Sequence, residues 1–530
     1  MKVSINDDRC QGHTLCNMAA PQVFGLRDDD GHAYVLVSEV DGELLIAARR
    51  GASTCPEQAI IITQELDRVV EIAGDIAADI EVSDDARVVS WLETLLGGDV
   101  VSSARQPRWR PMWFVDIDRG DSIERVVVRG ERTDTPLAFP LKHEMTFQRL
   151  LDEHDIPVPK VLGWCDQPAA YAMAVVPGKP DFAGVPAQQR ATIVDEYVQT
   201  LARMHRLPIN KFVEAGVVHG ASPADAAHIG IRRFEHLYRS TKVRPDPLME
   251  FVLGWLRRHP LPVSTRQAPI VWDSGQFHHD AGHFVSLIDV ELGHVGDPMM
   301  DLAAWRMRDS VIPYGDFNKI YDRYAELTGE PVDMAAIQYH HLFFTLTNQL
   351  SFHGPLARPL ANTDYMTYAH WVSETNLHTV ETMAEYLGLE LDDVEIPDTT
   401  VTPVSGPHQH LSRSLQSINV ADPFVKYQVR IAFRLARHLE RFDQIGAEVM
   451  ERDRSDVSAL TGKASYGWDE CEADLERFVL ADNGTHDDEL VILFNRRWRR
   501  YKALMGPPGS AMTAHHTMQP LGRSLLVPSR

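Results

Sequence analysis

The chain has 530 residues, which is too long for one compact core, and at about 150 residues per domain it predicts three or four folding units. Hydrophobic residues make up 44% of the chain and charged residues 24%, which is typical of a globular protein rather than a disordered or membrane protein. The formal net charge of −23 argues against nucleic acid as the main ligand, because phosphate repels an acidic surface, and it suits basic protein partners instead.

The N-terminal residues MKVSINDDRC contain neither the basic nor the apolar segment of a secretory signal. No later run approaches the ~20 apolar residues that span a bilayer. We therefore expect a cytoplasmic protein with no membrane span. The five cysteines do not make a disulfide framework, because their number is odd and the chain is long, and a reducing compartment would keep them as thiols or metal ligands.

The first part of the chain, residues 1–64, alternates short apolar runs with helical stretches, which predicts a compact α+β unit. Strands are expected at residues 2–5, 33–37 and 59–62, and a helix at about 42–53. Residues 65–100 are acidic and carry apolar residues at helical spacing. They predict an acidic helical linker.

The central part, residues 101–392, begins with strand patterns and continues with helical ones. Strands at 112–117 and 123–128, joined by a turn at 118–121, predict a β-hairpin. A helix at 143–154 and strands at 161–164 and 171–176 follow, and the remainder is helical except for short strands near 270–292. We expect a lobe of five strands followed by a helical lobe.

The last part predicts a second linker at 393–407, a helical C-terminal domain at 408–505 and a disordered tail at 506–530. The run 494–501 mixes arginines with aromatic residues and predicts an amphipathic helix. Three pairs of adjacent histidines, at 278–279, 340–341 and 515–516, are scattered along the chain. We interpret them as solvated or packed histidines rather than as metal ligands.

The strongest chemical signal is a set of three cysteines, Cys10, Cys16 and Cys55, with His13 between the first two. Bacterial ferredoxins take their cluster ligands from a C-x2-C-x2-C run plus a remote C-P, and here His13 replaces the middle cysteine while Pro56 follows Cys55. Three thiolates are the number that a 3Fe-4S cluster takes. A structural zinc site of the Cys3His type is the alternative, but zinc sites usually pair close ligands, and Cys55 stands alone.

The residues Cys10-Gln11-Gly12-His13, Cys16, Ala20-Pro21-x-Val23-Phe24 and Cys55-Pro56-x-x-Ala59-Ile60 resemble the small bacterial ferredoxins that serve cytochromes P450. The resemblance covers residues 1–63. It implies an iron–sulfur electron carrier with a redox partner such as a cytochrome P450 or a ferredoxin reductase. Three roles are open for His13. It is a nitrogen ligand to a fourth iron, which would give a 4Fe-4S cluster, or it is a weak or switchable ligand, or it is a bystander.

The central part also places charged residues where phosphoryl transfer requires them. That reaction needs a cation on the nucleotide phosphates, a carboxylate near the attacking hydroxyl, and carboxylates that hold Mg²⁺. Arg129 ends a predicted strand and Glu144 lies in the next helix. Asp273 and Asp289 each follow an apolar strand, so they can converge on one metal.

Three segments resemble the aminoglycoside phosphotransferase family, which has a protein-kinase-like fold, and in particular the branch joined to acyl-CoA dehydrogenases. These segments are Ile156-Pro157-Val158-Pro159-Lys160 after Glu144, the helix Leu201-Ala202-Arg203-Met204-His205, and the run from Leu287 to Leu302 with Asp289, Asp297-Pro298 and Asp301. The resemblance implies ATP and Mg²⁺ as cofactors and a small-molecule hydroxyl as acceptor. Asp273 would be the catalytic base and Asp289 a Mg²⁺ ligand. Arg129 would replace the nucleotide-binding lysine and pair with Glu144.

The sequence departs from that family at several positions. The usual His-Gly-Asp is Val271-Trp272-Asp273, and the metal-binding asparagine is replaced within 274–278, where Gln276 offers an amide oxygen. No glycine-rich loop precedes the first strand of the hairpin. Two hypotheses follow for this multidomain α+β chain, with its ferredoxin-like module, two-lobed kinase-like domain and helical C-terminal region. It is a ferredoxin fused to a phosphotransferase, or a ferredoxin fused to an inactive pseudokinase that binds a substrate or an oxygenase partner.

Overall fold

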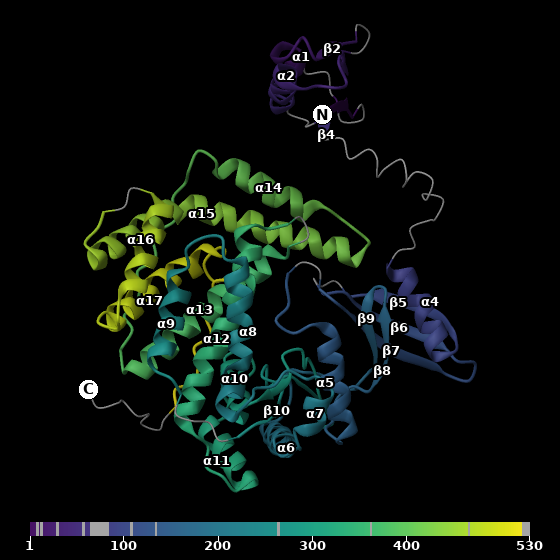
Figure 1. Cartoon of the computed structure of the whole chain (residues 1–530), viewed down its shortest axis with the longest axis vertical. Helices are drawn as coiled ribbons and strands as arrows, with labels where there is room; N and C mark the ends of the chain where they lie inside the picture. The colour runs from purple at the N-terminus through teal and green to yellow at the C-terminus, as the bar shows by residue number, and fades with distance from the viewer. Residues whose placement is uncertain are drawn as a thin grey trace. The chain divides into compact units, whose positions relative to one another are not determined.

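The computed structural model describes residues 1–6, 10, 14–27, 31–55, 59–63, 84–106, 110–132, 135–261, 266–360, 363–464 and 467–521. His13, one of the predicted cluster residues, lies outside these ranges. The chain divides into two compact units, Met1–Ser83 and Asp84–Arg530 (Figure 1). Within the described residues, none of the helices combines the length and the apolar character needed to cross a membrane.

The first unit is a small α+β module. Its elements are β1 (Lys2–Ile5), α1 (Leu15–Ala19), β2 (Phe24–Leu26), β3 (Ala33–Val35), α2 (Gly42–Ser53) and β4 (Ile60–Thr63). The first and last strands pair antiparallel, with Val3 opposite Ile62, and β2 pairs with β3. Phe24 is fully buried in the core, and a Cβ at Gly51 would lie 2.4 Å from its ring, so α2 can approach the core only through a glycine. The predicted α+β unit is confirmed.

The second unit begins with a lobe built on one five-stranded antiparallel sheet. Its elements are α4 (Asp84–Leu96), β5 (Asp99–Arg105), β6 (Met112–Asp118), β7 (Ile123–Gly130), α5 (Leu141–Glu153), β8 (Val161–Asp166) and β9 (Ala169–Ala174). The strand order is β5-β6-β7-β9-β8. The predicted hairpin is β6–β7, and its turn contains Gly120 at φ 88°, a conformation that favours glycine.

The two faces of this sheet are covered by different helices. Val126 and Val128 of β7 face α4, where they share a core with Val88 and Leu92, whereas Val127 lies with Leu141 of α5. We predicted a linker at residues 65–100, but the structure places residues 84–100 in this lobe, because α4 buries its apolar side on the sheet (Figure 1). Of the predicted linker, residues 65–83 lie outside the described ranges.

The second lobe is mainly helical and carries four short strands. Its elements are α6 (Ala187–Met204), α7 (Asn210–Glu214), α8 (Pro223–Thr241), α9 (Pro247–Arg258), β10 (Ala268–Ile270), β11 (Phe277–Asp280), β12 (His283–Leu287), β13 (His294–Gly296), α10 (Pro298–Asp309), α11 (Phe317–Thr328), α12 (Met334–Ala357) and α13 (Tyr365–Leu387). The strands form two antiparallel pairs, β10–β13 and β11–β12. Asp273 lies just before the β11–β12 hairpin and Asp289 just after it, as the sequence predicted.

The C-terminal helices pack on this lobe. They are α14 (Ser405–Ser417), α15 (Pro423–Thr461), α16 (Trp468–Ala481) and α17 (Asp487–Leu504). Leu475 of α16 and Phe494 of α17 belong to the same buried cluster as Trp255 of α9, and the rings of Phe251 and Phe494 are 5.8 Å apart. The region predicted as a separate helical domain at 408–505 therefore shares a core with the helical lobe.

The structure also corrects the prediction for the segment after α17. We predicted a disordered tail at 506–530, but residues 506–521 lie against the helical lobe. The carbonyl of Gln519 accepts hydrogen bonds from Arg306, and Leu521 is buried in the core of that lobe. This order comes from contacts with residues far away in the sequence, so no local pattern could reveal it. Residues 522–530 lie outside the described ranges.

Candidate functional site

The first candidate site is formed by the three predicted cysteines of the N-terminal unit. Cys10 follows β1, Cys16 lies in α1 and Cys55 follows α2. The pairing of β1 with β4 and the packing of α1 on α2 bring these three segments to one core, in which Cys10 and Cys16 are each only 8% exposed. The fold thus gathers thiols that are up to 45 positions apart, as the numbers of Cys10 and Cys55 give.

The environment of these thiols suits a metal cluster. The backbone N–H of Ala59 donates to Cys55 Sγ at 3.4 Å. Burial raises the pKa of Cys16, and the neighbouring Cys55 and Cys10 raise it further, because thiolates gathered in one apolar place repel each other. Such a set becomes favourable when iron neutralises it, and backbone N–H groups on the sulfur atoms are among the contacts that tune iron–sulfur clusters. The described thiols therefore fit an iron–sulfur cluster, whereas the 3Fe-4S type and the role of His13 stay predictions.

The second candidate site lies in the second unit, where β7 and α5 face the loop after β12. Arg129 Nε lies 2.7 Å from Glu144 Oε1, so the predicted pair of β7 and α5 is present. The same guanidinium contacts Asp289 Oδ1 at 2.5 Å and Glu291 Oε2 at 3.1 Å through Nη2. Arg110 completes the group, with contacts of 3.0 Å to Glu144 and 2.5 Å to Glu291.

These ion pairs are largely shielded from water, which strengthens their effect on the pKa values of the carboxylates. The side chains of Arg110, Arg129 and Glu144 are 7%, 9% and 2% exposed. Burial alone would raise the pKa of Asp289, but Arg129 and Arg110 hold it below its usual value, whereas burial keeps the pKa of Glu291 raised. Asp289 is therefore a carboxylate that already has a positive partner within the chain.

Asp273 has a comparable partner that the sequence did not reveal. Arg308 of α10 forms an ion pair with Asp273 Oδ1, and Gln276 Nε2 donates to Asp273 Oδ2 at 2.8 Å. Burial raises the pKa of Asp273 to about 6 even though Arg308 opposes the shift. The predicted metal ligand Gln276 is thus beside the predicted base, and its amide nitrogen is used to hold that base.

The backbone around both aspartates is strained and firmly held. Trp272 and Asp289 have φ values of 57° and 58°, in the left-handed region that residues other than glycine rarely adopt. The N–H of Trp272 donates to Asp301 Oδ1 at 2.6 Å, and His205 Nε2 lies 2.9 Å from the other oxygen of Asp301. Asp301 and His205, which the sequence singled out only as parts of motifs, therefore fix the loop that carries Asp273.

Three residues of this site were not predicted to act in it: Arg110, Glu291 and Arg308. Arg110 and Glu291 are 181 positions apart, and Arg308 is 35 positions from its partner Asp273. Ion pairs at such separations leave no periodicity in the sequence. In the described part of the site, three guanidinium groups thus face four carboxylates, Glu144, Asp273, Asp289 and Glu291, each of which has an arginine partner.

Comparison with protein families identifies two regions. Residues 3–62 match the family described as "4Fe-4S single cluster domain", and residues 108–336 match the family described as "Phosphotransferase enzyme family". The chain is 44% identical over 62 residues to a ferredoxin of Thermococcus litoralis, and 36% identical over 63 residues to Ferredoxin-2 of Streptomyces griseolus. Each match covers 12% of this chain and 98% of the relative.

The central region has more distant relatives. The chain is 24% identical over 217 residues to mouse acyl-CoA dehydrogenase family member 10, a match that covers 36% of this chain and 20% of the relative. It spans only about a fifth to a third of the acyl-CoA dehydrogenase relatives that it matches from mouse, rat and Arabidopsis, with shares of 20%, 23% and 30%.

Among solved structures, the chain is similar to a macrolide 2'-phosphotransferase of Brachybacterium faecium, with 16% identity, a TM-score of 0.38 and coverage of 55% of this chain and 97% of that one. An ethanolamine kinase of Plasmodium vivax gives 14% identity, a TM-score of 0.40 and coverage of 59% and 95%. By its N-terminal unit the chain belongs to the ferredoxins, and it joins to this ferredoxin a domain of the phosphotransferase enzyme family with a kinase-like fold.

Proposed function

We propose that the chain is an iron–sulfur electron carrier whose kinase-like domain binds a phosphate-bearing ligand without a metal ion and transfers no phosphoryl group. The proposal that the kinase-like domain binds phosphate without a metal ion rests on the position of Arg129. Its guanidinium contacts both Glu144 and Asp289, the residue expected to hold Mg²⁺. The positive charge that Mg²⁺ supplies to a kinase is here supplied by a side chain.

The electron-carrying half of the proposal rests on Cys10, Cys16 and Cys55 as ligands of a 3Fe-4S cluster. When bound, such a cluster accepts and returns one electron. A cytochrome P450 or a ferredoxin reductase is the proposed redox partner, and the net charge of −23 suits a partner with a basic docking face. Electron paramagnetic resonance distinguishes the cluster types, because the oxidised three-iron cluster is paramagnetic and the corresponding four-iron cluster is silent. His13→Cys is expected to convert the first spectrum into the second.

The proposed binding of a phosphate-bearing ligand rests on N–H groups of Arg129 that are not used in its described ion pairs. Among the described residues, the three carboxylate contacts of Arg129 involve Nε and Nη2, and the two N–H groups of Nη1 are the donors that we propose for a phosphate oxygen. A planar guanidinium also matches phosphate geometry better than an ammonium does. We therefore expect an organic phosphate, with ATP as the practical probe, to bind whether or not Mg²⁺ is present.

Phosphoryl transfer to a hydroxyl is the second candidate function, and the pKa of Asp273 favours it. A carboxyl with a pKa of about 6 is closer to the ideal of a general base near neutral pH than an ordinary aspartate. For this function Arg308 would have to leave Asp273, and Arg129 would have to release Asp289 to Mg²⁺. Both rearrangements separate ion pairs that are partly buried.

One pair of variants distinguishes the two candidates by calorimetric titration of the full chain with ATP. In Arg129→Lys the ammonium cannot span Glu144 and Asp289 as the two guanidinium nitrogens do, so Asp289 becomes available to a metal. We expect the wild type to bind ATP equally in Mg²⁺ and in EDTA, and Arg129→Lys to bind more tightly in Mg²⁺. Arg119→Lys, at an exposed ion pair with Glu124, is the matched control and should behave as the wild type.

A turnover assay completes the test. ADP formation by the wild type that stops in Asp273→Asn would establish phosphoryl transfer and overturn the proposed inactive domain. Absence of ATP binding in both Mg²⁺ and EDTA would overturn both candidates for this domain, while the electron-carrier function would stand on its own spectroscopic test.

A further inference from the structure

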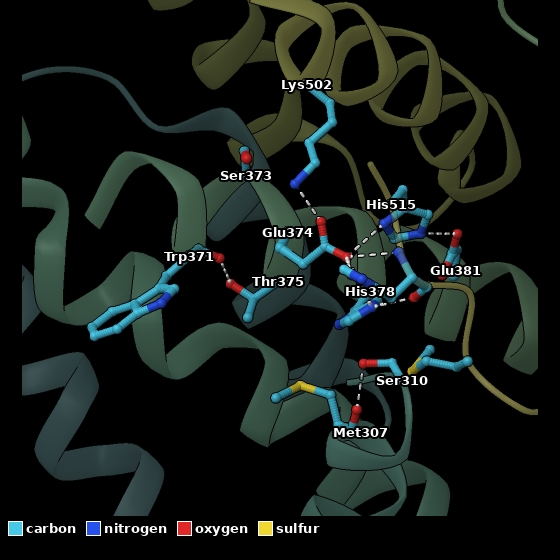
Figure 2. A network of polar contacts seen from close by, with 12 residues as sticks. Met307, Ser310, Trp371, Ser373, Glu374, Thr375, His378, Glu381, Lys502 and His515 are labelled. Carbon is cyan, nitrogen blue, oxygen red and sulfur yellow. Dashed lines mark hydrogen bonds and ion pairs between the residues drawn. The ribbon is translucent and has the colours of Figure 1, made fainter. Parts of the chain in front are cut away.

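A cluster of histidines and glutamates lies outside both sites, where the segment after α17 meets α13 (Figure 2). Glu374, His378 and Glu381 lie on α13, Lys502 is near the end of α17, and His515 belongs to the segment 506–521. Figure 2 shows the ring of His515 between the two carboxylates, with His378 beneath it. Neither the cluster-binding cysteines nor the kinase-like site uses these residues.

Three of these side chains offer ligand atoms to one point. One atom each from Glu374, His378 and His515 lies within 4.8 Å of the others. His515 Nδ1 is 3.0 Å from Glu374 Oε1, and His378 Nε2 is 3.8 Å from the same oxygen. A tetrahedral zinc ion with bonds of about 2.0 Å separates its ligands by about 3.3 Å. Residues 374 and 378 are one turn apart on α13, a spacing that places both ligands on one helix face.

The surroundings orient these ligands as the outer shell of a metal site does. His515 Nε2 lies 2.6 Å from Glu381 Oε1, so a hydrogen bond to Glu381 fixes the ring and leaves Nδ1 directed at Glu374. Metal-binding histidines usually donate their other N–H to a carboxylate in this way. Lys502 forms an ion pair with Oε2 of Glu374, whereas Oε1 faces the histidines and accepts the backbone N–H of His516 at 2.9 Å.

His378 is the most buried of these three side chains. Its side chain is only 2% exposed, and Nε2 is the ring nitrogen that lies 3.8 Å from Glu374 Oε1. Because a carbonyl only accepts, this Nε2 donates to the carbonyl of His516 at 2.9 Å, so metal binding through Nε2 would shift the ring proton to the buried Nδ1, which has no hydrogen-bond partner among the described residues.

We propose that Glu374, His378 and His515 bind a divalent transition metal of the zinc class, and that this metal ties the segment 506–521 to α13. His516 is the proposed fourth ligand, since its Nδ1 lies 3.3 Å from the shared oxygen Glu374 Oε1. Two or three imidazoles with one carboxylate form a ligand set that suits Zn²⁺. No electron transfer is involved, and each histidine must bind the metal in its deprotonated form.

Protonation of His515 is the alternative to a metal ion in this cluster. His515 lies between the carboxylates of Glu374 and Glu381, at 3.0 and 2.6 Å, so a ring protonated on both nitrogens can hold the segment without a metal ion. The other charged groups here are Lys502 against Glu374 and Arg499, which lies 3.0 Å from Glu381. A latch made by a proton alone and a metal site predict different metal contents, which makes the two distinguishable.

The test is metal binding by the full chain with its cluster already assembled, so that the cluster cysteines are occupied. After dialysis against Zn²⁺, we expect one more equivalent of zinc in the wild type than in His515→Ala or Glu374→Gln. His236→Ala, an exposed histidine of α8, is the matched control and should keep the wild-type content. Glu381→Gln, which weakens the outer hydrogen bond to His515 and removes the ion pair with Arg499, should lower the Zn²⁺ affinity by roughly 10- to 100-fold.

Substitution with Co²⁺ checks the ligand type. We expect the visible absorption of tetrahedral Co²⁺ without a thiolate charge-transfer band, and its loss in His515→Ala. Cluster-loaded wild-type protein that takes up no zinc would overturn the proposal whether or not the variants fold. Zinc uptake that is equal in the wild type and both variants would do the same, and would leave a proton latch as the function of these residues.

Discussion

The cysteine site and the carboxylate site are both groups of acidic side chains, but they differ in what balances their charge. The described contacts on the cysteine sulfur atoms come from backbone groups, such as the N–H of Ala59 on Cys55. In the kinase-like domain, each carboxylate of the site has an arginine partner from the same chain. The first site is built to receive an outside cation, and the second already contains its cations.

The largest expected effect is on the cysteine site. Cys16→Ser or Cys55→Ser removes one of three thiolates, and we expect the iron content and the visible absorption of the purified full chain to fall close to zero. Cys165→Ala is the matched control, because Cys165 is a buried thiol in the sheet of the second unit. It should keep the full cluster. Equal iron in Cys16→Ser and in the control would show that the sequence misidentified the ligands.

The next effect is the loss of an internal cation from the carboxylate site. Arg129→Ala leaves the buried Glu144 with Arg110 alone and takes the arginine partner from Asp289. Removal of one partner of a buried ion pair costs about 3–5 kcal/mol of unfolding free energy. Chemical denaturation followed by tryptophan fluorescence measures this cost. Arg119→Ala, at an exposed pair, should cost less than about 1 kcal/mol, and similar losses in both variants would contradict the internal balance proposed for the site.

These two sites also differ in how much of them the sequence predicts. The three cysteines, the pair Arg129–Glu144 and the positions of Asp273 and Asp289 beside a hairpin follow from local spacing and motifs. Arg110 and Arg308 do not, since Arg110 meets Glu291 only where the two lobes pack, and Arg308 meets Asp273 only through the folding of the helical lobe. A motif identifies the carboxylates of the site, but only the three-dimensional structure shows which arginine side chains pair with them.

The same limit applies to the fold. The strands of the first lobe were predictable because Trp113, Val115 and Ile117 alternate in burial along β6. The attachment of α4 to the sheet and of segment 506–521 to the helical lobe was not predicted. The acidic composition around α4 indicates a linker. Segment 506–521 has no periodic pattern, because its order depends on contacts such as that of Gln519 with Arg306.

The smallest expected effect is a pH dependence within the carboxylate site. The pKa of Asp273 is raised to about 6 in the folded chain, above its ordinary value of 3.8. The folded state therefore binds this proton more readily than the unfolded state, and stability from this group increases as pH falls through 6 toward 4. We expect the wild type to gain about 1–2 kcal/mol relative to Asp273→Asn between pH 7 and pH 4.5. A difference that does not change with pH would indicate an ordinary, solvated carboxylate.

The most direct test of the central claim is the effect of Mg²⁺ on ATP binding by the wild-type full chain, measured by titration calorimetry in Mg²⁺ and in EDTA. If Arg129 supplies the charge that a metal supplies in a kinase, the two dissociation constants should agree within about twofold, a difference of about 0.4 kcal/mol. ATP binding that occurs only with Mg²⁺, or that tightens more than tenfold with it, would contradict the account and return Asp289 to the role of a metal ligand.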